Sequence, residues 1–247
     1  MIKRRTNRIA VSLALSVAFM AFLVLLGSAG EKPARIIVML GGTMPEGLIQ
    51  GATYFLFFWG ILEVAVLGSR IRHEEEAFDR HFLVEDKEWV YSADDTYKLK
   101  QKLEEKNSQK PYQLLDLAIL VCVKYRLSHS SSEALSVLES ESANMNAAIE
   151  SEQSFLRYIA WAIPSVDFIG TVLGIASSLG YANQASTPEG IEHVTSALSV
   201  AFDTTLVALF LSVILMLAIH ALQKRQDDLY TRLRTYILHN LINRLYH

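Results

Sequence analysis

The sequence has little cysteine and little charge of either sign. Its single cysteine, Cys122, excludes an internal disulfide framework and a cysteine-based zinc site. Charged residues make up 20% of the 247 residues, whereas an average soluble protein has roughly 25%. The formal net charge of −3 lacks the strong basic excess that a nucleic-acid partner requires. These absences disfavour an ordinary soluble domain and exclude nucleic acid as the expected partner.

The motifs of common enzyme chemistry are also missing. The chain has no glycine-rich phosphate loop, no dinucleotide-binding fingerprint, no G-x-S-x-G and no H-E-x-x-H. The seven histidines are scattered, and the pair His73 and His81 lacks a nearby third ligand. We therefore expect no catalytic residue, no metal site and no cofactor, and the sequence does not support an enzyme.

What the sequence does contain is long apolar runs. Apolar residues make up 51% of the chain and concentrate in four blocks, at 9–27, 51–69, 158–180 and 194–222. At about 1.5 Å per residue, nineteen residues reach roughly 28 Å, which is enough to cross the hydrocarbon core of a bilayer. The pattern predicts an all-α, polytopic membrane protein with four transmembrane helices.

The basic residues orient these blocks. Lys and Arg number four in residues 1–8, twelve in 70–157 and five in 223–247, so 21 of the 23 lie on one side if all four blocks span. This predicts cytoplasmic termini and two short outside loops. A cleaved signal peptide is the alternative for the first block, but nineteen apolar residues exceed the usual 7–15 of such a segment.

The polar segments predict long cytoplasmic helical extensions. The run 113–127 is apolar but too short to span, and Ser130 to Glu133 is typical of a helix start. Glycine is then absent up to Gly170, so a single helix could leave the cytoplasm and cross the membrane. The apolar spacing at 222, 229, 233, 237 and 241 predicts that the fourth span continues as an amphipathic helix.

The expected organisation therefore has four parts. Residues 1–69 hold a first pair of transmembrane helices, and 70–157 form a cytoplasmic helical region. Residues 158–222 hold a second pair, and 223–247 form a cytoplasmic C-terminal helix.

Three acids lie in the apolar blocks, where an ionised side chain costs about 2.5–3.5 kcal/mol on insertion scales. Glu63 is close to Arg70 and could reach the cytoplasmic interface. Asp167 and Asp203 lie deeper and are harder to explain. Intramembrane acids usually face a protein interior or a water-filled path.

Small and hydroxyl residues form two stripes at helical spacing. One stripe comprises Asp167, Thr171, Gly174 and Ser178, and the other comprises Ala201, Thr205, Ala208 and Ser212. Close helix packing explains such stripes, and so does an ion path lined by hydroxyls; periodicity favours packing without excluding the path. Asp203 is about 200° around a helix from Thr205, so the two side chains cannot line one surface. If Thr205 faces a pore, Asp203 faces another helix or a neighbouring subunit, or it lies at the outer mouth of the pore.

The same helices carry a resemblance to a known family. Pro164-Ser-Val-Asp-Phe-Ile-Gly-Thr-Val-Leu-Gly-Ile175 resembles the P-x-x-G-x-x-G-T-V-x-G-I signature of the MotA/TolQ/ExbB proton channel family. The segment 197–209, which includes Thr204 and Thr205, is similar to the A-L-x-x-x-x-x-x-T-x-x-G-L segment of that family's last span. The likeness covers about residues 130–225.

This resemblance implies a ring of five copies in the bacterial inner membrane, around two copies of a single-span partner whose membrane aspartate carries the proton. It implies pore-lining roles for Thr171 and Thr205, close packing at Gly170 and Gly174, and a kink at Pro164. Three positions depart from the pattern: Asp167 and Ala208 stand where the family commonly has Gly, and Val200 stands where one branch has a glutamate.

The expected function is the ring-forming subunit of an ion-driven, stator-like rotary motor that passes H⁺, or alternatively Na⁺, inward. The candidate ion-pathway residues are Thr171, Thr204, Thr205, Asp167 and Asp203; the candidate packing residues are Pro164, Gly170, Gly174 and Ala208. The alternative is a non-conducting membrane scaffold whose cytoplasmic helices recruit partners.

Overall fold

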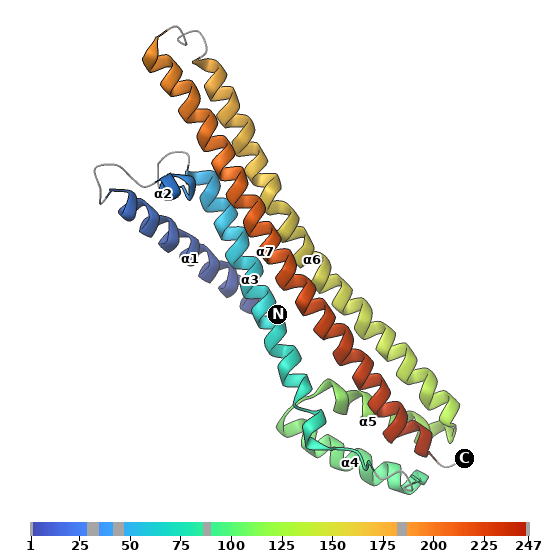
Figure 1. Cartoon of the computed structure of the whole chain (residues 1–247). Coiled ribbons are helices and arrows are strands. Elements are labelled where there is room, and N and C mark those ends of the chain that lie inside the picture. Colours follow the sequence, from blue (N-terminus) through green and yellow to red (C-terminus); the bar gives the residue numbers. More distant parts are fainter. Residues whose placement is uncertain (1, 29–34, 42–46, 86–89, 182–186, 246–247) are drawn as a thin grey trace. The chain divides into compact units, whose positions relative to one another are not determined.

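A computed structural model of the chain describes residues 2–28, 35–41, 47–85, 90–181 and 187–245 (Figure 1). Helices α1 (Ile2–Ser28), α3 (Gly47–Glu75), α6 (Ser131–Gly180) and α7 (Pro188–Asn240) are each long and apolar enough to cross a membrane. In the described ranges the sole β-type pairing is an isolated bridge between Tyr91 and Leu245. The all-α fold class with four candidate spans is confirmed.

The shorter helices complete the chain order. They are α2 (Arg35–Met39), the 3₁₀ turn η1 (Phe78–Arg80), α4 (Ala93–Gln109), α5 (Gln113–Ser128) and the 3₁₀ turn η3 (Ile242–Arg244). The chain divides into two compact units. The membrane unit comprises Met1–Ala65 and Ser154–His220, and the helical unit comprises Val66–Gln153 and Ala221–His247. Helices α3, α6 and α7 contribute residues to both.

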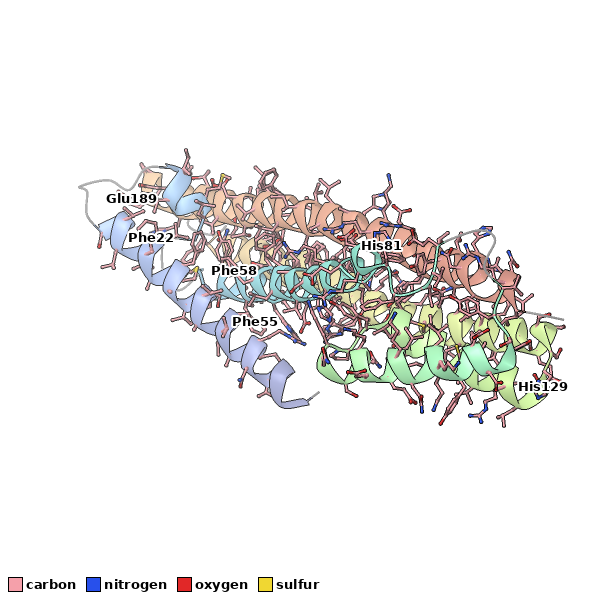
Figure 2. The ribbon with its side chains drawn as sticks, turned by 90° about the horizontal axis from the view of Figure 1, so that it is seen from below. Phe22, Phe55, Phe58, His81, His129 and Glu189 are labelled. Carbon is pink, nitrogen blue, oxygen red and sulfur yellow. The ribbon has the colours of Figure 1, made fainter. Side chains whose placement is uncertain are left out.

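Aromatic packing joins α1 to α3 in the membrane unit. The ring of Phe19 on α1 meets Tyr54 edge-on with centroids 4.9 Å apart, and it meets Phe58 at 5.9 Å. The labels of Phe22, Phe55 and Phe58 locate these helices in Figure 2. Tyr54 also donates a hydrogen bond to the carbonyl of Leu40, just after α2, at 2.9 Å. Leu23, Tyr54 and Val207 form the buried centre of this cluster, so α7 packs onto the same pair.

A glycine sets the approach of α3 to α7 within the membrane unit. A Cβ atom added to Gly60 would lie 2.6 Å from Cδ2 of Leu215 and 3.4 Å from Cγ2 of Ile159 on α6. Leu215 is fully buried, so it has little room to move. The missing side chain at Gly60 therefore lets the three helices meet closely in the middle of the apolar run of α3.

Two helices that begin in the helical unit, α4 and α6, have side-chain caps at their N-termini. Ser92 caps α4 by a capping box with Asp95, whose carboxylate accepts from both the hydroxyl and the N–H of Ser92. Ser130 caps α6, because its hydroxyl accepts the N–H of Glu133 at 3.3 Å. The helix that starts there continues through 50 residues to Gly180. The expected start at Ser130 to Glu133 and the single long helix are both confirmed.

The C-terminal part of α7 supplies the core of the helical unit. The residues at 222, 229, 233, 237 and 241 are all buried, as the amphipathic spacing predicts. The short apolar helix expected at 113–127 is α5, which buries seven of its side chains. Arg244 joins η3 to the segment after η1, since its guanidinium donates to the carbonyls of Val84 and Glu85 at 2.5 and 3.2 Å.

The single cysteine gives a direct test of this core. Cys122 on α5 is 1% exposed, and burial raises the pKa of its thiol to about 12. We expect a maleimide at pH 8 to react with Cys122 more than about 100-fold faster in denaturant, where the thiol regains a pKa near 8.5. The control is Ser108→Cys in a Cys122→Ala background, because residue 108 is exposed on α4. Equal rates at Cys122 before and after unfolding would show that α5 is not buried.

Candidate functional site

A proline in α6 leaves one backbone carbonyl without its helical donor. Pro164 lies inside α6 and has no N–H, so the carbonyl of Ala160, four residues earlier, loses its usual partner. The hydroxyl of Ser212 on α7 donates a hydrogen bond to that carbonyl at 3.0 Å. A freed carbonyl in an apolar environment costs free energy unless it is satisfied. Ser212 therefore stabilises the proline position and joins α7 to α6.

Two threonines meet where the stripes face each other. The hydroxyl oxygens of Thr171 on α6 and Thr205 on α7 are 2.5 Å apart and share a hydrogen bond. The hydroxyl of Thr205 also lies 3.0 Å from the carbonyl of Ala201, one turn earlier. Further along, Ser178 donates to the carbonyl of Val194 at 3.0 Å. The two stripes predicted from spacing thus face each other within one chain.

Glycines allow this close approach. A Cβ atom on Gly174 would lie 2.8 Å from the Cβ of Ala201, and one on Gly170 would lie 2.9 Å from Cγ2 of Ile49 in the first turns of α3. Real Cβ atoms essentially never approach so closely. Ala208, the other candidate packing residue, is 1% exposed. Both glycines of the motif therefore sit where a larger residue forces neighbouring helices to shift.

The two deep acids have different surroundings. Asp167 on α6 is 1% exposed, and neither carboxylate oxygen has a hydrogen-bond partner among the described residues. The hydroxyl groups of Thr204 and Thr205 face it from α7 without reaching hydrogen-bonding geometry. Asp203 is partly exposed, and the helical rotation of about 200° places it away from Thr205. The structure brings Asp167 and the three threonines together and leaves Asp203 apart.

The third acid has an ion-pair partner that the sequence did not suggest. Glu63 is 7% exposed, and its carboxylate accepts from the guanidinium of Arg8 on α1 at 3.1 Å and from the indole of Trp59 at 3.3 Å. The basic partner thus comes from α1 rather than from Arg70, which pairs with Glu152 at 3.3 Å. No local spacing could have identified a partner 55 residues away.

A cavity of about 240 Å³ lies in the membrane unit beside these residues. Its lining includes Ile49, Gly170, Gly174, Ser177, Ala201 and Thr204. Sequence reasoning missed this cavity, because the backbone at glycine and alanine positions creates it only when three helices are in place.

The histidines belong to other contacts. The ring of His73 stacks on Tyr112 with centroids 4.7 Å apart, and His81 pairs with Glu85 at 2.7 Å. Over the described ranges, no group of three or more His, Cys, Asp or Glu side chains could hold a metal ion. The polar groups described at the pairing of α6 with α7 are hydroxyls, backbone carbonyls and the carboxylate of Asp167.

Comparison with known proteins gives one match. A model of the family described as "MotA/TolQ/ExbB proton channel family" matches residues 97–235, more than half of the chain. No curated protein and no solved structure matches the chain. The matched range begins in α4, covers α6 and reaches residue 235 of α7, and it includes Pro164, Asp167 and Ser212 together with the three threonines of the hairpin.

The link between Pro164 and Ser212 can be tested by a double-mutant cycle. Ser212→Ala is expected to lower the free energy of unfolding by about 1–3 kcal/mol, because the Ala160 carbonyl becomes a buried unsatisfied acceptor. In a Pro164→Ala background the loss is expected to shrink, since residue 164 regains an N–H for that carbonyl. Denaturant titration of the purified protein in detergent measures both values.

The matched control is Ser165→Ala, because the hydroxyl of Ser165 donates to the carbonyl of Trp161 in its own helix at 2.9 Å. We expect it to change stability by less than about 0.5 kcal/mol. Equal costs of Ser212→Ala in both backgrounds would show that the hydroxyl does not substitute for the missing N–H.

Proposed function

This chain belongs to the MotA/TolQ/ExbB proton channel family, and from that premise we propose that it is the ring-forming subunit of an ion-driven, stator-like motor. The ring passes H⁺ inward through a pathway that includes Thr171 and Thr205, and a single-span partner converts the flow into mechanical work. The observation that carries the proposal is the meeting of the two threonine hydroxyls, 2.5 Å apart, on the two helices that the family match covers.

The threonine pair offers oxygen ligands inside an apolar span. A proton or a partly dehydrated ion in a membrane needs oxygens in place of the water it leaves. The hydroxyls of Thr171 and Thr205 and the carbonyl of Ala201 supply three oxygens at one level. On the outer faces of the same helices the side chains are apolar and exposed, such as Phe168 and Phe210.

A single α6–α7 hairpin cannot enclose a path by itself. Its hydroxyls bond to each other and to helix carbonyls, and its exposed faces are suited to lipid or to another protein. Several copies around a central partner would provide the enclosure. We propose five copies of this chain, two copies of a single-span partner with an intramembrane aspartate, and cytoplasmic termini in a bacterial inner membrane.

One observation favours the alternative of a non-conducting scaffold. Because the hydroxyl stripes satisfy each other within one chain, packing alone explains their spacing. The two functions differ in ion flow, since a scaffold needs the stripes for assembly only. Replacing the hydroxyls by a side chain of the same shape separates them.

Thr171→Val with Thr205→Val is the deciding variant. Valine keeps the volume and removes the oxygens, so we expect ring assembly to persist and proton uptake to fall by at least tenfold, which corresponds to about 1.4 kcal/mol on the barrier. The measurement is proton uptake into proteoliposomes that contain this chain and its partner under an imposed potential. Native mass spectrometry of the same preparation reports assembly.

The matched control is Thr195→Val on α7, because Thr195 is exposed and its hydroxyl donates to carbonyls of its own helix. It should leave uptake unchanged. Wild-type uptake in the double variant would remove Thr171 and Thr205 from the pathway, and absence of uptake in the wild-type complex would favour the scaffold.

A further inference from the structure

Asp167 is an acid buried inside the membrane unit. It is 1% exposed, and neither of its carboxylate oxygens has a partner among the described residues. The other acids of the spans differ: Glu63 on α3 has Arg8 and Trp59, and Asp203 is partly exposed. An isolated carboxylate in such a place is costly, and it becomes neutral or acquires a cation.

In this structure the hydroxyls near Asp167 donate to other oxygens. Thr204 and Thr205 both donate to the carbonyl of Ala201, at 3.1 and 3.0 Å. The hydroxyl of Thr171 shares its proton with Thr205 or with the carbonyls of Asp167 and Ala201. What these oxygens can still offer is lone pairs. Lone pairs repel a carboxylate and accept a hydrogen bond from a carboxylic acid.

A cavity lies beside Thr204, one of the residues near Asp167. Thr204 lines the cavity of about 240 Å³. A single water molecule needs a cavity of only roughly 10–15 Å³. Gly170 and Gly174 also line it, and their lack of a Cβ leaves the space that a side chain would fill. Thr204 thus borders the cavity on α7 and faces Asp167 on α6.

We propose that Asp167 is a proton-binding site of the ring subunit itself, neutral at rest, and that it loads from water in the cavity beside Thr204. The inference deepens the proposed function and rests on it for the direction of flow. On loading, a hydronium ion in the cavity gives up one proton: its O–H bond breaks and leaves a water molecule, and the O–H bond of Asp167 forms and cancels the charge of the carboxylate. On release, that bond breaks and the proton passes to the membrane carboxylate of the single-span partner. Each ring subunit then carries an exchangeable proton of its own.

Infrared difference spectroscopy tests the resting state directly. The full-length chain in lipid vesicles should show a carboxylic-acid C=O band at neutral pH that is lost in Asp167→Asn and disappears as the pH is raised. The matched control is Glu63→Gln, a second buried acid whose carboxylate is paired with the guanidinium of Arg8, and it should remove no such band. Asp167→Gly is the second variant, because glycine at this position suits helix packing should the amide fold poorly.

Each result decides one claim. A spectrum in which Asp167→Asn and Asp167→Gly remove no acid band means that Asp167 is ionised, and the proposal fails. Loss of the wild-type band on adding Na⁺ at constant pH means that a metal cation rather than a proton binds, and the proposal also fails.

Proton uptake with the partner separates this inference from the proposed function. We expect Asp167→Asn to reduce uptake by at least about tenfold. If the acid band is present while Thr171→Val with Thr205→Val conducts normally, the threonine pathway falls and the proton site stands. If the acid band of Asp167 is absent while Thr171→Val with Thr205→Val loses proton uptake, the proton site is wrong and the threonine pathway stands.

Discussion

The packing of α6 against α7 depends on hydroxyl groups that bond across the helix pair to backbone carbonyls and to each other. Pro164 frees the Ala160 carbonyl, and Ser212 supplies the missing donor from the opposite helix. Further along the hairpin, the hydroxyls of Thr171 and Thr205 share a hydrogen bond, and Ser178 donates to the carbonyl of Val194 on the opposite helix. In a bilayer every polar backbone group must be satisfied internally, so these contacts fix how close and in which register the two helices lie. At that separation, a Cβ atom on residue 174 would lie too close to Ala201, so the position requires glycine.

The same oxygens that hold the hairpin together are the ones an ion pathway needs, and this explains why packing and conduction are hard to separate by pattern. A hydroxyl that donates to a carbonyl keeps its lone pairs, so one threonine can stabilise the helix pair and accept a proton from a neighbour. Asp167 is the group that the packing role leaves unexplained, because a small residue would fit its place at lower cost. The burial of Asp167 is explained if a proton or another cation binds to its carboxylate.

Much of the fold could be predicted from the sequence, and less of the site. The apolar blocks, the short helix α5 and the helix start at Ser130 are local patterns, and the structure has each of them. The stripes containing Thr171 and Thr205 were visible as spacing, but spacing does not say that they face each other. The ion pair of Glu63 with Arg8 joins residues 55 apart in sequence, and the cavity beside Thr204 arises from three helices together. Such features depend on tertiary packing, which no local pattern contains.

The central claim is that this chain acts as a ring around a single-span partner in an ion-driven motor. The most direct measurement is the mass of the intact complex, purified from its membrane together with that partner and imaged in the same preparation. The account predicts five copies of this chain surrounding two copies of a partner whose one span carries an aspartate. A monomer or a dimer of this chain that is purified without any such partner would contradict it.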